Sequence, residues 1–343
     1  MKIKTLAKYI DQPLLINKLN KQMPKLLVGA GTAIAVGDAI KHRDEKDRFV
    51  KNAIIATSII GTTLVATKKF NLLDIKPAKE IIQEQTKAVR EYIQKTNLKD
   101  ENLLSILKKS EKDHLSKDAV QVLFDNLKDD SNRTALFKVL FNEDKNLTSK
   151  EIFSEIGRLS VLGAIPVVSG IGGGIVADAV TGTSSKHKRA NKVKEGFYQY
   201  FANIFLCNVG AGAALLGAEK LQKKGVIKSL TPTKKLGVIL AGITTTGIVG
   251  GSYIANFLSK KVINPLFGQK KDDKKGIYSE RKPEALDIAL HADDIATAGV
   301  LSGLKWIEPV LPVMYFVSGF RAGTGYRNGH KLDSKFDESK VCK

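Results

Sequence analysis

Four residues come closest to a chemically competent set, and they are Glu284, Asp287, His291 and Asp294. Their steps of three, four and three residues place them within an arc of about 80° on a helix. Carboxylates and an imidazole on one helix face can bind a divalent cation or relay protons. The competing interpretation is a solvated face near a helix start, where the helix dipole favours acids. Because one helix supplies too few ligands by itself, this second interpretation is the stronger.

No other set of side chains resembles a catalytic site. No combination of Ser, His and an acid stands out for nucleophilic catalysis. The two cysteines are Cys207, inside an apolar run, and Cys342, near the end of the chain, and they cannot form a disulfide framework or a paired-cysteine metal site. We therefore expect no cofactor, and a membrane-bound metal-dependent enzyme is the third hypothesis for the function.

Charged residues inside apolar segments form a second group of candidates. Lys305 and Glu308 interrupt the apolar stretch 295–320, and Asp178 lies at the end of another apolar run. Charged side chains at bilayer depth usually face the bundle interior or a cavity, so Lys305 and Glu308 could mark a polar passage. They could equally lie in an exposed link between two half-length helices near Trp306, because Trp suits the membrane interface. Asp178 is expected at the interface.

Small residues recur at intervals of four in several apolar runs. The pairs are Gly170 and Gly174, Gly247 and Gly251, and Ala213 and Gly217. Such faces let helix backbones approach in lipid, so they predict helix packing inside a bundle or between the copies of a homo-oligomer. In a water-soluble helix each glycine would cost about 0.5–1 kcal/mol relative to Ala, which is harder to explain in a soluble core. The alternative is that a Gly-rich sequence produces these spacings by chance.

The apolar runs themselves predict membrane helices. Three long runs lie at 159–182, 196–218 and 236–259, and as helices they would extend about 33–36 Å, enough to cross a hydrocarbon core of about 30 Å. Two shorter runs, 26–40 and 52–67, are below the roughly 20 residues that cross a bilayer upright. We expect these two to form a re-entrant, shallow or buried helical hairpin. The number of spans is thus between three and six.

Changes in composition along the chain predict five regions. They are a basic amphipathic segment at 1–23, an apolar hairpin at 24–67, a soluble helical insertion at 68–158, the main membrane helix region at 159–320 with a polar loop at 260–294, and a polar tail at 321–343.

The chain is strongly basic, with a net charge of +20. Nucleic acid is not the expected partner, because the positive charges recur in every polar segment and are not interleaved with aromatic residues that could stack on bases. A Lys-rich surface beside apolar segments suits anionic lipid headgroups, at about 1 kcal/mol for each basic residue. A compositional bias without any partner would give the same pattern.

These patterns predict an all-α, multi-pass membrane protein with packed Gly-rich helices and a helical extramembrane insertion. The expected partner is the lipid bilayer, and which membrane holds the protein is not predicted. The expected function is non-enzymatic, either a membrane scaffold or a component for transport or passage. The competing class is a soluble or peripheral helical protein whose Gly-rich hairpins are buried in its core.

Overall fold

The computed structural model describes residues 13–73, 75–95, 101–110, 149–228, 232–266, 292–301 and 305–325. Every regular element in these ranges is a helix, and none of their residues is in a strand. The predicted all-α fold class is therefore confirmed.

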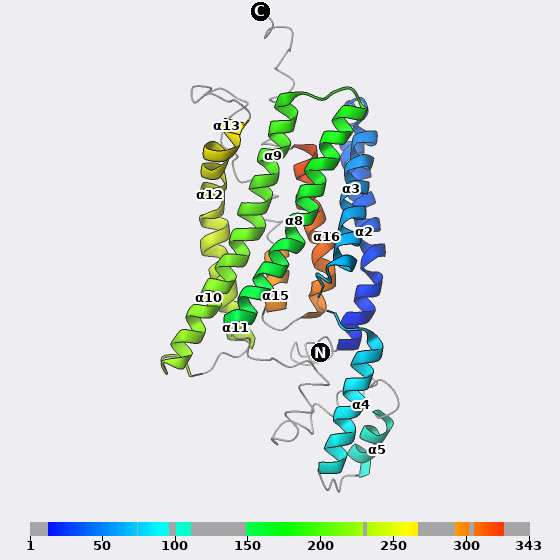
Figure 1. Ribbon diagram of the computed structural model, residues 1–343, viewed down its shortest axis with the longest axis vertical. Helices are drawn as coiled ribbons and strands as arrows, with labels where there is room; N and C mark the ends of the chain where they lie inside the picture. Colours follow the sequence, from blue (N-terminus) through cyan, green and yellow to red (C-terminus); the bar gives the residue numbers. More distant parts are fainter. Residues whose placement is uncertain are drawn as a thin grey trace, which may run out of the picture.

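Long helices stand side by side in a bundle (Figure 1). They are α2 (Pro13–Lys41), α3 (Arg48–Lys69), α8 (Ser149–Val180) and α9 (Lys186–Tyr200), which continues through the π-helical turn η1 (Phe201–Phe205) into α10 (Leu206–Lys223). The second half adds α11 (Pro232–Ile243), the π-helical turn η2 (Thr244–Val249), α12 (Gly251–Leu258), the π-helical turn η3 (Ser259–Ile263) and α13 (Asn264–Leu266). The C-terminal part adds α15 (Ala292–Leu301), the 3-10 helix η4 (Lys305–Val310) and α16 (Leu311–Thr324).

Two helices of the predicted insertion project beyond one end of the bundle, the lower end in Figure 1. These are α4 (Ala78–Lys95) and α5 (Glu101–Ser110). At the same end the amide of Asn17 in α2 donates to the carbonyl oxygen of Lys76 at 2.8 Å, which ties the base of α4 to the bundle. Residues 74, 96–100 and 111–148 of the insertion lie outside the described residues, and its last ten residues, 149–158, form the start of α8.

Four helices are long and apolar enough to cross a membrane. They are Ile16–Lys41, Arg48–Lys69, Phe153–Val180 and the continuous α9–η1–α10 helix Lys186–Lys223. The first two correspond to the runs that we expected to be too short, since each helix continues past its apolar run into the flanking lysines. Lys side chains allow this because their stems cover apolar surface while the ammonium groups reach water.

The predicted span at 236–259 does not form one of these four helices. The hydroxyl groups of Thr244, Thr245 and Thr246 donate to carbonyl oxygens four residues earlier, at 2.8, 3.0 and 2.7 Å. Such bonds compete with the backbone ladder and bend helices, and glycines at 247, 250 and 251 follow directly. The run is accordingly divided into α11, η2 and α12.

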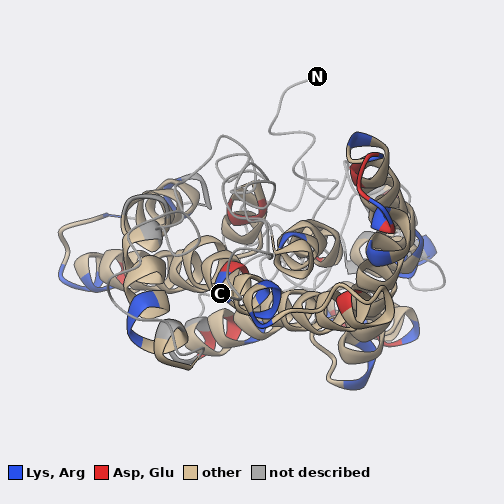
Figure 2. Cartoon of the chain, turned by 90° about the horizontal axis from the view of Figure 1, so that it is seen from above, with Lys and Arg blue, Asp and Glu red and all other residues tan. Residues whose placement is uncertain are grey.

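The outward face of α8 is apolar along its length. Its exposed residues from Gly157 onward are Gly157, Val161, Val168, Gly172, Val176, Ala179 and Val180. This face extends about 35 Å at 1.5 Å per residue, close to the thickness of a bilayer core. Seen along the bundle, the helices are mostly tan, and blue and red residues gather at helix ends and turns (Figure 2). A helix facing water would instead carry polar residues here.

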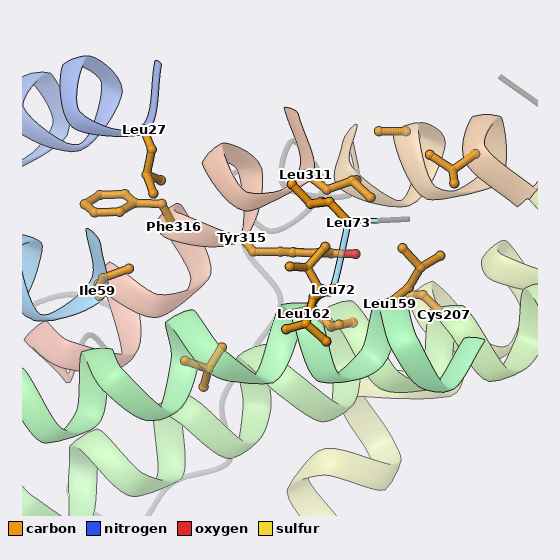
Figure 3. Packing of buried hydrophobic residues seen from close by; sticks show 14 of the residues in the cluster. Leu27, Ile59, Leu72, Leu73, Leu159, Leu162, Cys207, Leu311, Tyr315 and Phe316 are labelled. Atoms are coloured by element: carbon orange, nitrogen blue, oxygen red, sulfur yellow. The ribbon is translucent and has the colours of Figure 1, made fainter. Parts of the chain in front are cut away.

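The interior between α2, α3, α8 and α16 is filled by large side chains. Phe316 of α16 packs near Leu27 of α2 and Ile59 of α3, while Tyr315 lies over Leu162 of α8 (Figure 3). All of these side chains are at most 1% exposed. The bundle therefore has a continuous packed core.

The helices α8 and α16 approach each other through glycines. A Cβ atom built on Gly170 would fall on the carbonyl oxygen of Gly319, and one built on Gly323 would lie 2.6 Å from the carbonyl oxygen of Gly170. A Cβ atom on Gly174 would likewise collide with the backbone of Gly323. The two backbones are thus in direct contact along this face, as small residues permit in lipid.

We expect Gly170→Ala to destabilise the fold, because its methyl group would separate α8 from α16. Overpacking of this kind costs about 1–3 kcal/mol. The matched control is Gly172→Ala in the same helix, where a Cβ atom would meet nothing within 4 Å. Thermal unfolding of the two variants in detergent measures the difference, and equal stability would contradict the contact.

Candidate functional site

A row of buried polar side chains follows the inner face of the α9–η1–α10 helix. Glu195, Gln199, Asn203 and Asn208 are each at most 2% exposed. Steps of four residues keep the first three on one face, and the last step of five continues it because η1 winds as a π-helix. The Gln199 amide donates to Glu195 at 2.8 Å, and the Asn203 amide donates to Gln199 at 2.9 Å. The amides and the carboxylate thus form a hydrogen-bonded chain.

A second set of polar side chains comes from α16. Tyr315, Ser318 and Arg321 follow one another at steps of three residues and are at most 6% exposed. Nε of Arg321 lies 3.9 Å from Oε1 of Glu195, which joins this set to the row on α9. The hydroxyl oxygen of Tyr315 lies 3.2 Å from that of Thr297 in α15.

The helix α15 brings two carboxylates into the same interior. Asp293 is 2% exposed and Asp294 is 3% exposed. Asp294 interacts with the buried thiol of Cys207. Neither carboxylate oxygen of Asp293 has a hydrogen-bond partner among the described residues. Its carboxyl lies in the first turn of α15, beside the backbone N–H groups of Asp293 and Asp294, so the helix N-terminus compensates part of its charge. A buried carboxylate without a side-chain partner is still costly, so its presence calls for a functional explanation.

Nearby, the amide of Asn208 donates to the hydroxyl of Ser160 in α8 at 3.2 Å. We call the whole row the polar file, and its members are Ser160, Glu195, Gln199, Asn203, Asn208, Asp293, Asp294, Thr297, Tyr315, Ser318 and Arg321.

Ion pairs lie at both ends of the polar file. At the lower end in Figure 1, Arg158 contacts Glu155 and Glu308, each at 2.5 Å, and also donates to the carbonyl oxygen of Leu72. We call these three charged residues the lower cluster. Glu308 is 1% exposed, so its charge depends on Arg158 for compensation.

At the upper end, Asp178 contacts the ammonium group of Lys192 at 2.5 Å and that of Lys51 at 3.4 Å. We call these three residues the upper cluster. Arg158 and Asp178 both belong to α8 and are separated by twenty residues, or about 30 Å. This separation is close to the thickness of a bilayer core, and the polar file lies between the two ion-pair clusters.

A pocket opens beside the upper cluster, between α3, α8, α9 and α16. Its volume is about 530 Å³, and Lys51, Asp178, Lys188 and Lys192 are among its lining residues. The start of α9 is fixed locally, because the hydroxyl of Ser185 accepts a bond from the backbone N–H of Lys188 at 3.2 Å. Residues of the first two turns of α9 therefore line the pocket.

Of the four predicted metal ligands, the structure describes only Asp294. Glu284, Asp287 and His291 lie outside the described residues, and Asp294 belongs to the polar file. Within the ranges that the structure describes, no group of three or more His, Cys, Asp and Glu residues could hold a metal ion. The metal site stays a prediction.

The charged residues predicted inside apolar segments lie near the two ion-pair clusters. Glu308 is a member of the lower cluster and Asp178 of the upper cluster. Asp178 is only 3% exposed, so it is not solvated. Lys305 is the first residue of η4, and its side chain is outside what the structure describes.

The remaining small residues have different surroundings. A Cβ atom on Gly247 would collide with the sulfur of Cys207, and one on Gly251 would lie 3.0 Å from the carbonyl oxygen of Ala202. These two glycines therefore lie against the α9–η1–α10 helix. Ala213 and Gly217 are exposed, and nothing lies within 4 Å of a Cβ atom on Gly217. Their part in an interface between copies stays a prediction.

Most of the polar file was not predicted. Gln199, Asn203 and Asn208 lie in a run that was treated as uniformly apolar, although amides repeating every four or five residues were a visible signal. Arg321 falls in the predicted polar tail, and Asp293 is not among the predicted site residues. Arg158 was the last charged residue before the long run at 159–182, and nothing near it in sequence indicates Glu308 as its partner.

Comparison with known proteins adds no activity. No protein-family model, no curated protein and no solved structure matches this chain. The four apolar helices are compatible with a multi-pass membrane protein, and the function rests on the geometry of the polar file.

Proposed function

We propose that this protein is a non-enzymatic, multi-pass membrane protein whose polar file is a passage for a small charged species through the bundle. The observation that carries the proposal is the polar file itself, which joins two ion-pair clusters about 30 Å apart inside helices with apolar outer faces. Ionisable side chains within membrane helices are expensive and commonly mark ion pathways or proton relays.

The proton is the species that fits this interior best. Several members of the polar file are hydrogen-bonded to one another, as in the chain from Glu195 through Gln199 to Asn203 and in the bond from Asn208 to Ser160. A hydrated ion needs open space, whereas a proton moves along hydrogen-bonded groups and enclosed water. Carboxylates at Glu195, Asp293 and Asp294 supply groups that can accept and release a proton along the way.

The other functional classes are less well supported. A soluble or peripheral protein with buried hairpins needs a polar outer face, but the exposed residues of α8 from Gly157 onward are apolar. A membrane scaffold would use the glycine contact between α8 and α16, but it has no need for a buried carboxylate such as Asp293 without a partner among the described residues. A metal-dependent enzyme has no ligand set in the described part of the chain.

The proposal is tested by reconstituting the full chain into lipid vesicles that contain a pH-sensitive dye. A pH step across the membrane is expected to decay faster in these vesicles than in protein-free vesicles, and valinomycin with K⁺ removes the opposing potential. The matched control is vesicles that hold the heat-inactivated chain at the same lipid ratio. Decay at the protein-free rate would refute a proton passage, and decay that depends on K⁺ or Na⁺ gradients would assign another ion.

A further inference from the structure

The pocket beside the upper cluster carries one more cationic side chain than carboxylates. We call it the upper pocket. Its cations are Arg48, Lys51, Lys188 and Lys192, and its carboxylates are Asp44, Glu45 and Asp178. Arg48 is compensated there by Glu45 at 3.0 Å and by Asp38 at 2.7 Å. The three lysines of the pocket, in contrast, have one buried carboxylate, Asp178, which Lys51 and Lys192 share.

Lys188 adds to this excess of positive charge. It lines the upper pocket one helical turn before Lys192, and its charge opposes that of Lys192. Like charges four residues apart destabilise a helix, so this arrangement favours an anion that contacts both ammonium groups.

Two helix N-termini face the same pocket and increase the positive potential. The first turns of α3 and α9 contain no acidic residue, and the acids nearest the start of α3 are its N-cap residue Asp47 and the preceding Asp44 and Glu45. Arg48 and Lys51 lie in the first turn of α3, and Lys188 lies in the first turn of α9. Cationic side chains at these positions oppose the helix dipoles, and a bound anion would relieve both unfavourable interactions.

Glycines hold the deepest cation of the pocket in place. A Cβ atom on Gly174 would lie 2.6 Å from Cε of Lys192, and one on Gly325 would lie 3.2 Å from its Cγ. The stem of Lys192 therefore passes between the backbones of α8 and α16. Lys192 as a whole residue is 4% exposed. A charge fixed in this way loses little conformational entropy when it binds a ligand.

The depth of the pocket indicates the chemical class of the anion. The pocket lies at the level of Asp178, near the end of the apolar face of α8, and this is the depth of lipid headgroups. Lysines bind phosphate as point charges, and basic pockets between membrane helices bind anionic headgroups. A volume of about 530 Å³ is ample for a phosphate group with its substituents.

We infer that the upper pocket binds a phosphate group, either that of an anionic lipid or free phosphate. Lys51 and Lys188 contact the phosphate, and Asp178 is an internal competitor that holds Lys192 when the pocket is empty. This inference does not depend on whether the bundle conducts protons.

Isothermal titration of the full chain in detergent micelles tests the inference. The two ligands are inorganic phosphate and phosphatidylglycerol, and phosphatidylcholine is the comparison lipid without net charge. Lys188→Gln is expected to weaken binding about fivefold, the equivalent of one surface lysine. Lys186→Gln is the matched control, because Lys186 is an exposed residue of the same helical turn and does not line the pocket. Binding of inorganic phosphate or of phosphatidylglycerol supports the inference and identifies the source.

A second variant changes the affinity in the opposite direction and keeps the test decisive if Lys188→Gln folds poorly. Asp178→Asn removes the internal competitor, so phosphate affinity is expected to rise about fivefold as Lys51 and Lys192 lose their carboxylate. The inference is overturned if neither ligand binds, if phosphatidylcholine binds equally well, or if binding is the same in all variants.

Discussion

Replacing Arg158 by Met is expected to lower the free energy of unfolding by about 3–5 kcal/mol, the largest loss of stability that we predict for a single substitution. The reason is the ion pair with Glu308. This residue is 1% exposed, and its carboxylate lies 2.5 Å from the Arg158 guanidinium. Without Arg158 this buried carboxylate loses the ion pair at 2.5 Å. The carbonyl oxygen of Leu72 loses its donor as well.

The double variant Arg158→Met, Glu308→Gln separates loss of charge compensation from loss of packing. Removing both charges should restore much of the stability, because the cost comes mainly from a buried carboxylate that has lost its closest ion-pair partner. Arg43→Met is the matched control, since Arg43 is exposed. Denaturant unfolding in detergent, followed by circular dichroism, measures all variants. If Arg158→Met unfolds like Arg43→Met, the lower cluster does not stabilise the fold.

Asp293→Asn is expected to stop proton passage and at the same time to stabilise the protein. The substitution keeps the shape of the side chain but removes a carboxylate that has no hydrogen-bond partner among the described residues. We expect a gain of about 1–3 kcal/mol in the free energy of unfolding. Proton flux in reconstituted vesicles should fall about tenfold or more, which corresponds to about 1.4 kcal/mol on the barrier. A substitution that lowers activity and raises stability is common where the function uses a destabilising side chain.

The neighbouring residue provides the control for this second prediction. Asp294 is equally buried, but it interacts with the thiol of Cys207. Asp294→Asn weakens that contact and should therefore lower the free energy of unfolding, whereas Asp293→Asn should raise it. If both variants lose stability by similar amounts, Asp293 is compensated in the folded protein, and the proposed use of its carboxylate loses its main support.

The helical fold was predictable because hydrophobic segments dominate the sequence signal. The charge-free stretch that begins at Leu159 is sufficient to predict the inner length of α8. The extent of α2 and α3 was underestimated, because the prediction ended each helix where lysines begin. Arg48 shows why this fails, since its side chain is buried by pairing with Asp38 and the helix α3 already begins there, four residues before the apolar run at 52–67. Helix boundaries of this kind depend on contacts between chain segments.

The candidate site was less predictable for the same reason. Glu308 and Asp178 stood out as charges within or beside apolar runs, but their partners are chosen by the fold. Arg158 precedes Glu308 by 150 residues, and no local pattern connects them. The amides Gln199 and Asn203 change the mean hydropathy of the long run at 196–218 only a little. Only their spacing of four residues could therefore have revealed a polar helix face.

The backbone contact between α8 and α16 also determines which part of the bundle can move. Where helices meet through side chains, a small slide is absorbed by new rotamers, but Gly170 and Gly319 have no rotamer to change. We infer that these two helices form a rigid frame, and that any opening of the interior comes from the α10–α12 side, where the π-helical turns η1, η2 and η3 provide hinges.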